Sequence, residues 1–402
     1  MNEIIDIFLE CNNYDIRKKD TGRWIDQKCT PDVINIIADC ILFYITENDE
    51  DSWFNMSIIR DMDYSADLVE MYYSKPRPER QSNEYDKFFS QPLELLAFSD
   101  VLFKEKKGRF NWYKVNNLKL LENIANNEKF AYNFLIKYIS KVLSDSEIKN
   151  IFDDFFAYQT QDQYFATKQQ FTVFTFNNTN ITTEDEAWRI FTKVLNPLAC
   201  YKNKLGTSGG RISKEPITYS DLIYNRRNFR DIYTQKPKGI KRKEWMEQID
   251  PKPPEFVIHH KSEKAKRFLK SFNNEYRKGY SEACDGDKEE ALQAHHIFQY
   301  KDFPEISYFY ENIIMLTPNQ HFLKAHPKNK TQQINRPYQK FLLEEKAKRI
   351  QENISDESVE TIYSFDRLVE VINEGFSKDY DEDDNSYNDA ISIIDECYSE
   401  IL

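Results

Sequence analysis

Glycine is scarce in this chain, with only 9 among 402 residues. Glycine marks tight turns and close backbone approaches, so a chain with few glycines and long amphipathic runs is expected to be mostly helical. The six cysteines form no CxxC pair, which argues against a zinc site built from cysteines. Scattered thiols are typical of a cytosolic protein. The cysteines are Cys11, Cys29, Cys40, Cys200, Cys284 and Cys397.

Long hydrophobic runs are absent as well. No stretch of 18 or more apolar residues occurs, and the N-terminus lacks the basic and then apolar pattern of a signal peptide. We therefore expect neither a membrane span nor secretion, and we expect a cytoplasmic protein. Hydrophobic residues make up 40% of the chain and aromatic residues 15%, which predicts a folded protein with two or three domains.

The net charge of −12 is unevenly distributed. Residues 351–402 hold 16 acidic and 2 basic residues, a net charge of −14, whereas residues 1–350 hold 51 acidic and 53 basic residues, a net charge of +2. Residues 200–244 hold 12 basic and 4 acidic residues, a local net charge of +8. The acidity therefore belongs to a tail, and the rest of the chain keeps a basic segment suited to a nucleic-acid partner. We expect the acidic patch at 379–384 to serve solubility, with competition against DNA as the alternative.

Local patterns predict an α+β fold with a mainly helical N-terminal region. Thr30-Pro31-Asp32 is typical of a helix start, and apolar periodicity continues from there to about Ile45. Further helices are expected over residues 84–98 and, in the tail, over residues 359–371. Two β-prone segments at 101–105 and 110–115 flank a basic, glycine-containing turn, which predicts a hairpin.

Two basic features are candidates for contact with DNA. Helices followed by a hairpin with a basic tip resemble a winged-helix unit, which implies DNA contacts by Lys107 and Arg109; an ordinary surface hairpin is the alternative. Residues 202–214 are expected to form a flexible basic segment that continues to residue 244 and neutralises phosphates, with a solvated linker between domains as the alternative. Its candidate contacts are Lys202, Lys204, Arg211, Arg226, Arg227 and Arg230.

All six histidines lie between residues 259 and 326, and four of them lie within 32 residues. Histidine titrates near neutral pH and is the commonest metal ligand, so this is where we expect chemistry. Residues 292–298 and 313–316 fit two short strands joined by a loop. Thr317 followed by Pro318, with Gln320 three residues after Thr317, predicts a short helix that starts with a capping box. His259 and His260 match no motif, and we interpret them as structural.

This stretch resembles the HNH nucleases. Their ββα-metal fold places a His-His or Asp-His pair on the first strand, an asparagine at the second strand and a histidine on the helix. The corresponding pattern here is Ala294-His295-His296-Ile297, then Asn312, then His321. The residues that follow the second strand, together with a long unrelated N-terminal region, are similar to HNH-type type II restriction endonucleases in particular.

The resemblance implies a role for each residue. His296 would be the general base that takes a proton from the attacking water, and Asn312 would orient its ring through a hydrogen bond to the other ring nitrogen. His295 and His321 would hold one divalent metal ion, expected to be Mg²⁺. Two imidazoles form a softer site than carboxylates, so Mn²⁺ or another transition metal is the alternative. Further candidates for a phosphate or metal contact are Lys324 and His326.

Adjacent strand residues point to opposite faces, so His295 and His296 share a site only where the strand bends or ends. With that condition, we expect a metal-dependent DNA endonuclease that acts as a sequence-specific type II restriction enzyme in a prokaryotic cytoplasm. Its expected partners are double-stranded DNA, a cognate DNA methyltransferase of the host and a second copy of the chain for double-strand cleavage. A low-specificity defence or mobile-element HNH nuclease and a non-catalytic winged-helix DNA-binding regulator are the alternatives.

Four divisions of the chain are expected. They are a helical, winged-helix-like DNA-recognition domain at 1–117, a helical domain with the basic segment at 118–250, the HNH nuclease domain at 251–350 and an acidic helical tail at 351–402.

Overall fold

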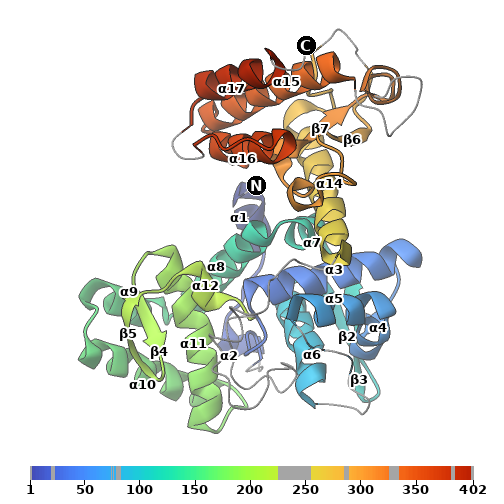
Figure 1. Ribbon diagram of the computed structural model, residues 1–402. Coiled ribbons are helices and arrows are strands. Elements are labelled where there is room, and N and C mark those ends of the chain that lie inside the picture. The colour runs from blue at the N-terminus through green and yellow to red at the C-terminus, as the bar shows by residue number, and fades with distance from the viewer. Residues whose placement is uncertain are drawn as a thin grey trace, which may run out of the picture. The chain divides into compact units, whose positions relative to one another are not determined.

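The protein is an α+β chain that is mostly helical and carries three small antiparallel sheets in its described residues. We describe a computed structural model (Figure 1). The described residues are 2–19, 23–73, 75, 77, 83–224, 255–284, 289–325, 335–381 and 385–399. The chain divides into two compact units, unit 1 (residues 1–250) and unit 2 (residues 251–402). The finer division into four domains stays a prediction.

Unit 1 is built around one hydrophobic core that continues from Ile5 to Leu222. The described helices of unit 1 are α1 (Asn2–Glu10), α2 (Ile16–Lys19), α3 (Pro31–Glu47), α4 (Met56–Asp61), α5 (Asp63–Tyr73), α6 (Asn83–Phe98), α7 (Leu118–Asn126), α8 (Glu128–Asp145), α9 (Lys149–Tyr158), α10 (Gln161–Asn178), α11 (Glu184–Tyr201) and α12 (Tyr219–Leu222). Its described strands are β1 (Phe54–Asn55), β2 (Leu102–Lys107), β3 (Phe110–Val115), β4 (Leu205–Ser208) and β5 (Arg211–Pro216).

Helix α3 lies at the centre of this core and begins where the sequence predicts. Thr30 precedes it in an extended conformation, and Pro31 occupies the first turn, where its missing N–H costs no helical hydrogen bond. The buried Asn35 side chain donates to the carbonyl oxygens of Ile124 and Ala125 at 2.6 and 2.9 Å, which ties α3 to the end of α7. The predicted helix over residues 84–98 is confirmed as α6.

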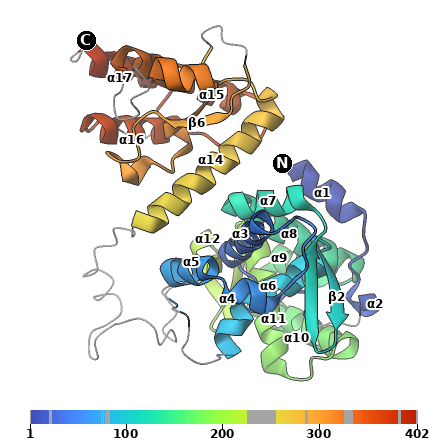
Figure 2. The ribbon, with the colours of Figure 1, turned by 90° about the vertical axis from the view of Figure 1, so that its right-hand side faces the viewer.

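The predicted hairpin over residues 101–115 is confirmed as β2 and β3, which run down one side of unit 1 (Figure 2). The register pairs Leu102 with Val115 and Lys107 with Phe110. Gly108 closes the turn with φ +63°, in the left-handed region that glycine adopts without strain. Strand β1 adds to the outer side of β3, so the sheet order is β1-β3-β2.

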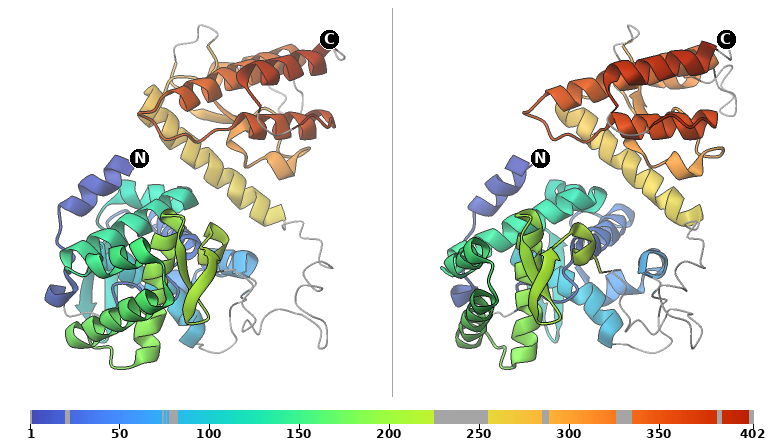
Figure 3. Two further views of the ribbon diagram at one scale, coloured as in Figure 1. Left: turned by 90° about the vertical axis from the view of Figure 1, so that its left-hand side faces the viewer. Right: turned by 60° about the vertical axis from the view of Figure 1, so that its left-hand side comes forward.

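The prediction of a flexible segment over residues 202–214 is wrong for most of that range. Residues 205–216 form the hairpin β4–β5, which packs on α11 (Figure 3). Gly206 is required there because an added Cβ would lie 2.5 Å from Asn196 Oδ1. The Asn196 side chain also bonds the backbone N–H and C=O of Thr207, so α11 anchors β4 directly. The short strands lack the apolar alternation that would have indicated them.

Unit 2 contains the histidine cluster. Its described elements are α14 (Glu255–Arg277), β6 (Gln293–His296), η1 (Pro304–Ile306), η2 (Tyr310–Asn312), β7 (Ile313–Leu316), η3 (Gln320–Ala325), α15 (Arg336–Ser355), α16 (Phe365–Phe376) and α17 (Tyr387–Ser399). Among the described residues of both units, no helix is long and apolar enough to cross a membrane.

The tail helix begins later than the sequence predicts, at Phe365 rather than at residue 359. The Asn353 side chain holds the preceding residues in an extended path by bonding Glu360 O and Ile362 N. Helix α16 packs tightly, since a Cβ added to Gly375 would lie 2.2 Å from the Phe298 ring. Helix α17 packs on α15, so the described tail helices share the core of unit 2.

Candidate functional site

A two-stranded hairpin and a short helix carry the histidine cluster, in the order that the sequence predicts. Strands β6 and β7 pair antiparallel, with Gln293 opposite Leu316 and His295 opposite Ile314. All four residues of β7 are buried, so the hairpin is fixed on one side by the core of unit 2. The helix after β7 is short and has the wide turns of a π-helix, η3.

The predicted capping box at the start of this helix is confirmed. Thr317 N donates to Gln320 Oε1 at 3.0 Å, and Gln320 N donates to Thr317 Oγ1 at 3.1 Å. Gln320 is fully buried, and its Nε2 also donates to Ala283 O at 2.9 Å. Ser281 donates its hydroxyl to Gln320 Oε1. The cap that precedes His321 is therefore locked onto residues 281–283.

The structure brings His295 and His321 together. His295 is buried on β6, His321 is in the first turn of η3, and their ring centroids lie 5.2 Å apart with planes at 78°. Imidazole nitrogens are good ligands for divalent transition metals, so the donor chemistry of this pair fits a metal ion. In the parts of the chain that the structure describes, no three His, Cys, Asp or Glu side chains are grouped so that they could hold a metal. His326 lies outside the described residues.

His296 is the last residue of β6, and its ring lies against other elements than the ring of His295 does. Its Nε2 lies 3.0 Å from Ser262 Oγ of α14 and 2.9 Å from the carbonyl oxygen of Ser307. A carbonyl oxygen only accepts hydrogen bonds, so Nε2 carries the proton in the tautomer that satisfies this contact. In a neutral ring, Nδ1 then bears the lone pair. Burial, and then the nearby Lys266 ammonium, lower the pKa of His296 to about 4, which keeps the ring neutral.

The hydrogen bond expected between Asn312 and the His296 ring is not formed, and this part of the prediction is wrong. Asn312 is fully buried and bonds backbone instead: its Oδ1 accepts from Phe298 N at 2.8 Å, and its Nδ2 donates to the carbonyl oxygens of Phe298 and Ile306 at 3.1 and 3.2 Å. These bonds close the loop between β6 and β7. Asn312 therefore positions His296 indirectly: it holds the loop that contains Ser307, and the Ser307 carbonyl accepts the hydrogen bond from the His296 ring.

His295 and His296 also line one small pocket in unit 2. Its other lining residues are Ile297, Gln299, Ala325, Asn335, Gln339 and Leu342. The strand ends at His296, so the condition under which the two adjacent histidines can serve one site is met. Lys324 is half-buried in η3, and its carbonyl oxygen accepts a hydrogen bond from Asn335 Nδ2 at 3.1 Å.

A buried ion pair behind β7 was not visible in the sequence. Lys346 Nζ of α15 lies 2.9 Å from Glu282 Oε1, with side-chain exposures of 0% and 4%. The other Glu282 oxygen accepts from Met315 N at 2.6 Å, while Glu282 N donates to Met315 O at 2.9 Å. Glu282 therefore bonds the edge of β7 that does not pair with β6. It does so at Met315, two residues before the Thr317 cap. The partners are 64 residues apart in the chain, and no local pattern indicates such a pair.

The predicted DNA contacts of unit 1 fall into two groups. Lys107 and Arg109 are exposed at the tip of the β2–β3 hairpin. Lys202, Lys204 and Arg211 are exposed at the end of α11 and on the β4–β5 hairpin. The remaining candidates lie outside the described residues; they are Arg226, Arg227 and Arg230.

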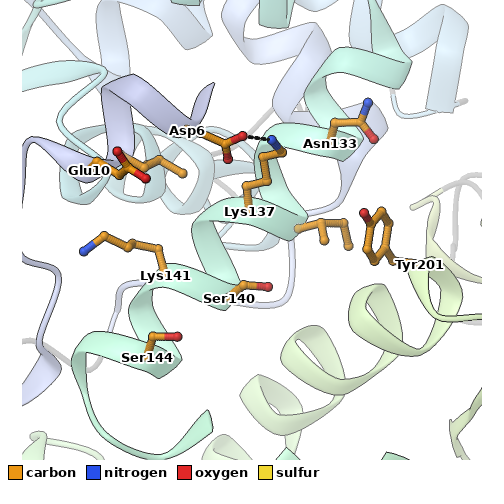
Figure 4. Close-up of a pocket in the computed structure, with 10 residues that line it drawn as sticks. Asp6, Glu10, Asn133, Lys137, Ser140, Lys141, Ser144 and Tyr201 are labelled. Carbon is orange, nitrogen blue, oxygen red and sulfur yellow. Dashed lines mark hydrogen bonds and ion pairs between the residues drawn. The ribbon is translucent and has the colours of Figure 1, made fainter. Parts of the chain in front are cut away.

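A further pocket in unit 1 lies between α1 and α8 (Figure 4). Its two cations are already paired, since Lys137 bonds Asp6 of α1 and Lys141 lies 2.6 Å from Asp145. We assign this pocket no function.

Comparison of the chain with protein-family models, with curated proteins and with solved structures found no match.

Proposed function

We propose that this protein is a metal-dependent DNA endonuclease of the HNH type, acting as a sequence-specific type II restriction enzyme. The observation that carries the proposal is the adjacency of the His295 and His321 rings, with His296 at the end of the same strand and its Nε2 held by a backbone carbonyl. Two separate elements, β6 and η3, contribute these side chains, and the capping box fixes where the second one begins.

His296 is the general base of the proposed reaction. Because Nε2 donates to the Ser307 carbonyl, Nδ1 is the nitrogen that takes a proton from the attacking water. The water oxygen bonds to phosphorus, and the bond from phosphorus to the 3′ oxygen breaks. The 3′ oxygen takes a proton from solvent, which leaves a 5′ phosphate and a 3′ hydroxyl. The attacking water would reach Nδ1 from the small pocket that His296 lines together with His295.

His295 and His321 are the residues that would hold the metal ion. When bound, a divalent cation supplies positive charge that stabilises the leaving 3′ oxygen. Two imidazoles favour Mn²⁺ or another transition metal over Mg²⁺ at equal concentration, because nitrogen donors suit these softer ions better. Mg²⁺ is nevertheless the abundant candidate.

Unit 1 is the proposed DNA-recognition part, with the β2–β3 hairpin as the wing of a winged-helix unit. Its exposed cations would neutralise phosphates, which fixes register on the duplex without reading sequence. One nuclease site per chain cuts one strand, so a restriction activity requires either a second copy of the chain or two successive nicks.

Incubation of the purified chain with plasmid DNA and each of Mg²⁺, Mn²⁺ and Ni²⁺ tests the proposal, with His296→Ala and a chelator as controls. Discrete fragments that need both the metal and His296 support a restriction enzyme. A smear from the wild-type protein removes sequence specificity and leaves a low-specificity nuclease. DNA binding without cleavage under every condition leaves a non-catalytic regulator.

A further inference from the structure

The outer face of the β1-β3-β2 sheet alternates aromatic rings with charges. The register places three cross-strand pairs on this face: Phe103 opposite Lys114, Glu105 opposite Trp112, and Lys107 opposite Phe110. The intervening residues of both strands face the other way, where Leu102, Tyr113 and Val115 are buried. Trp53 lies two residues before Asn55, which pairs with Trp112, so Trp53 is on the same face of the sheet as Trp112.

Two of the rings on this face are exposed, and the other two, Trp53 and Trp112, are half-buried. Phe103 is 51% exposed and Phe110 is 45% exposed. The Lys107 ammonium lies 4.3 Å from the Trp53 ring centroid and 5.9 Å from that of Trp112, and the Arg109 guanidinium lies 4.8 Å from the Phe110 ring centroid. These cations lie over ring faces, so each of these aromatics has positive charge beside it.

The charge of the hairpin selects the kind of partner. On this face and its turn, Lys107, Arg109 and Lys114 accompany one acid, Glu105, a net charge of +2 in a chain whose net charge is −12. Lys107 pairs with Glu105 at 3.2 Å and Lys114 pairs with Asp51; because both acids are exposed, such pairs are weak and a phosphate can replace them. A surface that interleaves rings with cations matches a ligand that interleaves flat bases with phosphates. In a duplex the base faces are stacked on one another, so only unpaired bases can stack on these rings.

We propose that this sheet face binds single-stranded DNA, with unpaired bases stacked on Phe103, Phe110 and Trp112 and phosphates neutralised by Lys107 and Arg109. The choice of DNA over RNA as the single strand rests on the proposed nuclease function, whereas the stacking argument is independent of it. This use of the sheet differs from that of a wing, which contacts duplex backbone through the hairpin tip alone.

The proposal is tested by titrating the protein with an oligothymidylate, in chelator and low salt, and following binding by tryptophan fluorescence. Phe103→Ala truncates a half-exposed ring and leaves the core of unit 1 intact, so misfolding does not confound it. Because stacking is worth about 1–3 kcal/mol per base, we expect binding to weaken by about 5- to 150-fold. Lys107→Met should weaken binding and reduce the salt slope by roughly one counterion.

Trp188→Ala is the matched control. Trp188 lies on α11, is 37% exposed and carries the Lys168 ammonium 3.6 Å from its ring centroid, so it reproduces a ring with its cation away from the sheet. Unchanged affinity in Phe103→Ala, or an equal loss in Trp188→Ala, would overturn the proposal. So would an equal loss of duplex and of oligothymidylate binding in Phe103→Ala, or self-association of the protein that Phe103→Ala abolishes.

The outcome separates from that of the proposed function. If oligothymidylate binding depends on Phe103 and the protein cuts no DNA with any metal, the sheet-face proposal stands and the nuclease proposal is rejected. Metal-dependent cleavage by a protein whose oligothymidylate binding ignores Phe103 does the reverse.

Discussion

Replacing Lys346 with methionine should destabilise unit 2 strongly while leaving unit 1 unchanged. The Lys346 side chain is fully buried, and its ammonium is the ionic partner of Glu282, which is also buried. The variant leaves the Glu282 carboxylate without its countercharge, and breaking one side of a buried pair costs about 3–5 kcal/mol. For a unit of this size that corresponds to a fall in melting temperature of roughly 10 °C.

The double variant Glu282→Gln with Lys346→Met should recover most of that loss. Glutamine keeps an acceptor for Met315 N, which the carboxylate bonds at 2.6 Å, and no unpaired charge is left. Replacing both members of a buried ion pair with neutral groups is often close to neutral in stability, whereas removing one is not. The double variant therefore separates the contribution of the unpaired charge to stability from that of the hydrogen bond to Met315 N.

The chain supplies its own internal control for this measurement. All five tryptophans precede residue 251, so tryptophan fluorescence follows unit 1 alone. Hydrogen exchange of amides in β7 and α15 follows unit 2. The reasoning is refuted if the free energy of unfolding of unit 2 in Lys346→Met lies within about 1 kcal/mol of the wild-type value, because an exposed ion pair contributes no more than that. It is also refuted if the double variant is less stable than the single one.

Three other outcomes are expected. Asn312→Ala should cost about 3 kcal/mol by chemical denaturation, because it leaves buried backbone groups of Phe298 and Ile306 without their partner, and it should raise hydrogen exchange in the loop between β6 and β7; unchanged exchange there would remove Asn312 as its clamp. The Arg17 guanidinium holds the pKa of Asp15 below its usual range, so Asp15→Asn should lose up to about 1 kcal/mol at pH 7. That difference should be present above about pH 4 and shrink as the pH falls through the lower pKa of the folded state; a difference that stays constant as the pH is lowered below about 4 would contradict the cause. His321→Ala should raise the metal concentration needed for half-maximal cleavage without weakening DNA binding, and the opposite pattern would place His321 among the DNA contacts.

Local patterns predicted the elements of the site well, because the signals for them are local. The capping box of Thr317 and Gln320 and the hairpin closed by Gly108 both follow from residues a few positions apart. The direction of the His296 ring did not follow, because its partners Ser262 and Ser307 lie on other elements. The partners of Asn312 did not follow either, because only the folded loop between β6 and β7 brings the backbone of Phe298 and Ile306 to its side chain. The β4–β5 hairpin was missed for a related reason: Asn196 of α11, rather than alternation within the strands, fixes β4.

The most direct test of the central claim is sequencing of DNA ends after incubation with the wild-type protein and with His296→Ala, each with Mn²⁺. The account predicts 5′-phosphate ends at defined positions from the wild type and intact DNA from the variant, with equal DNA binding by both. Cleavage by His296→Ala at the wild-type rate, or intact DNA from the wild type with every divalent metal, would contradict it.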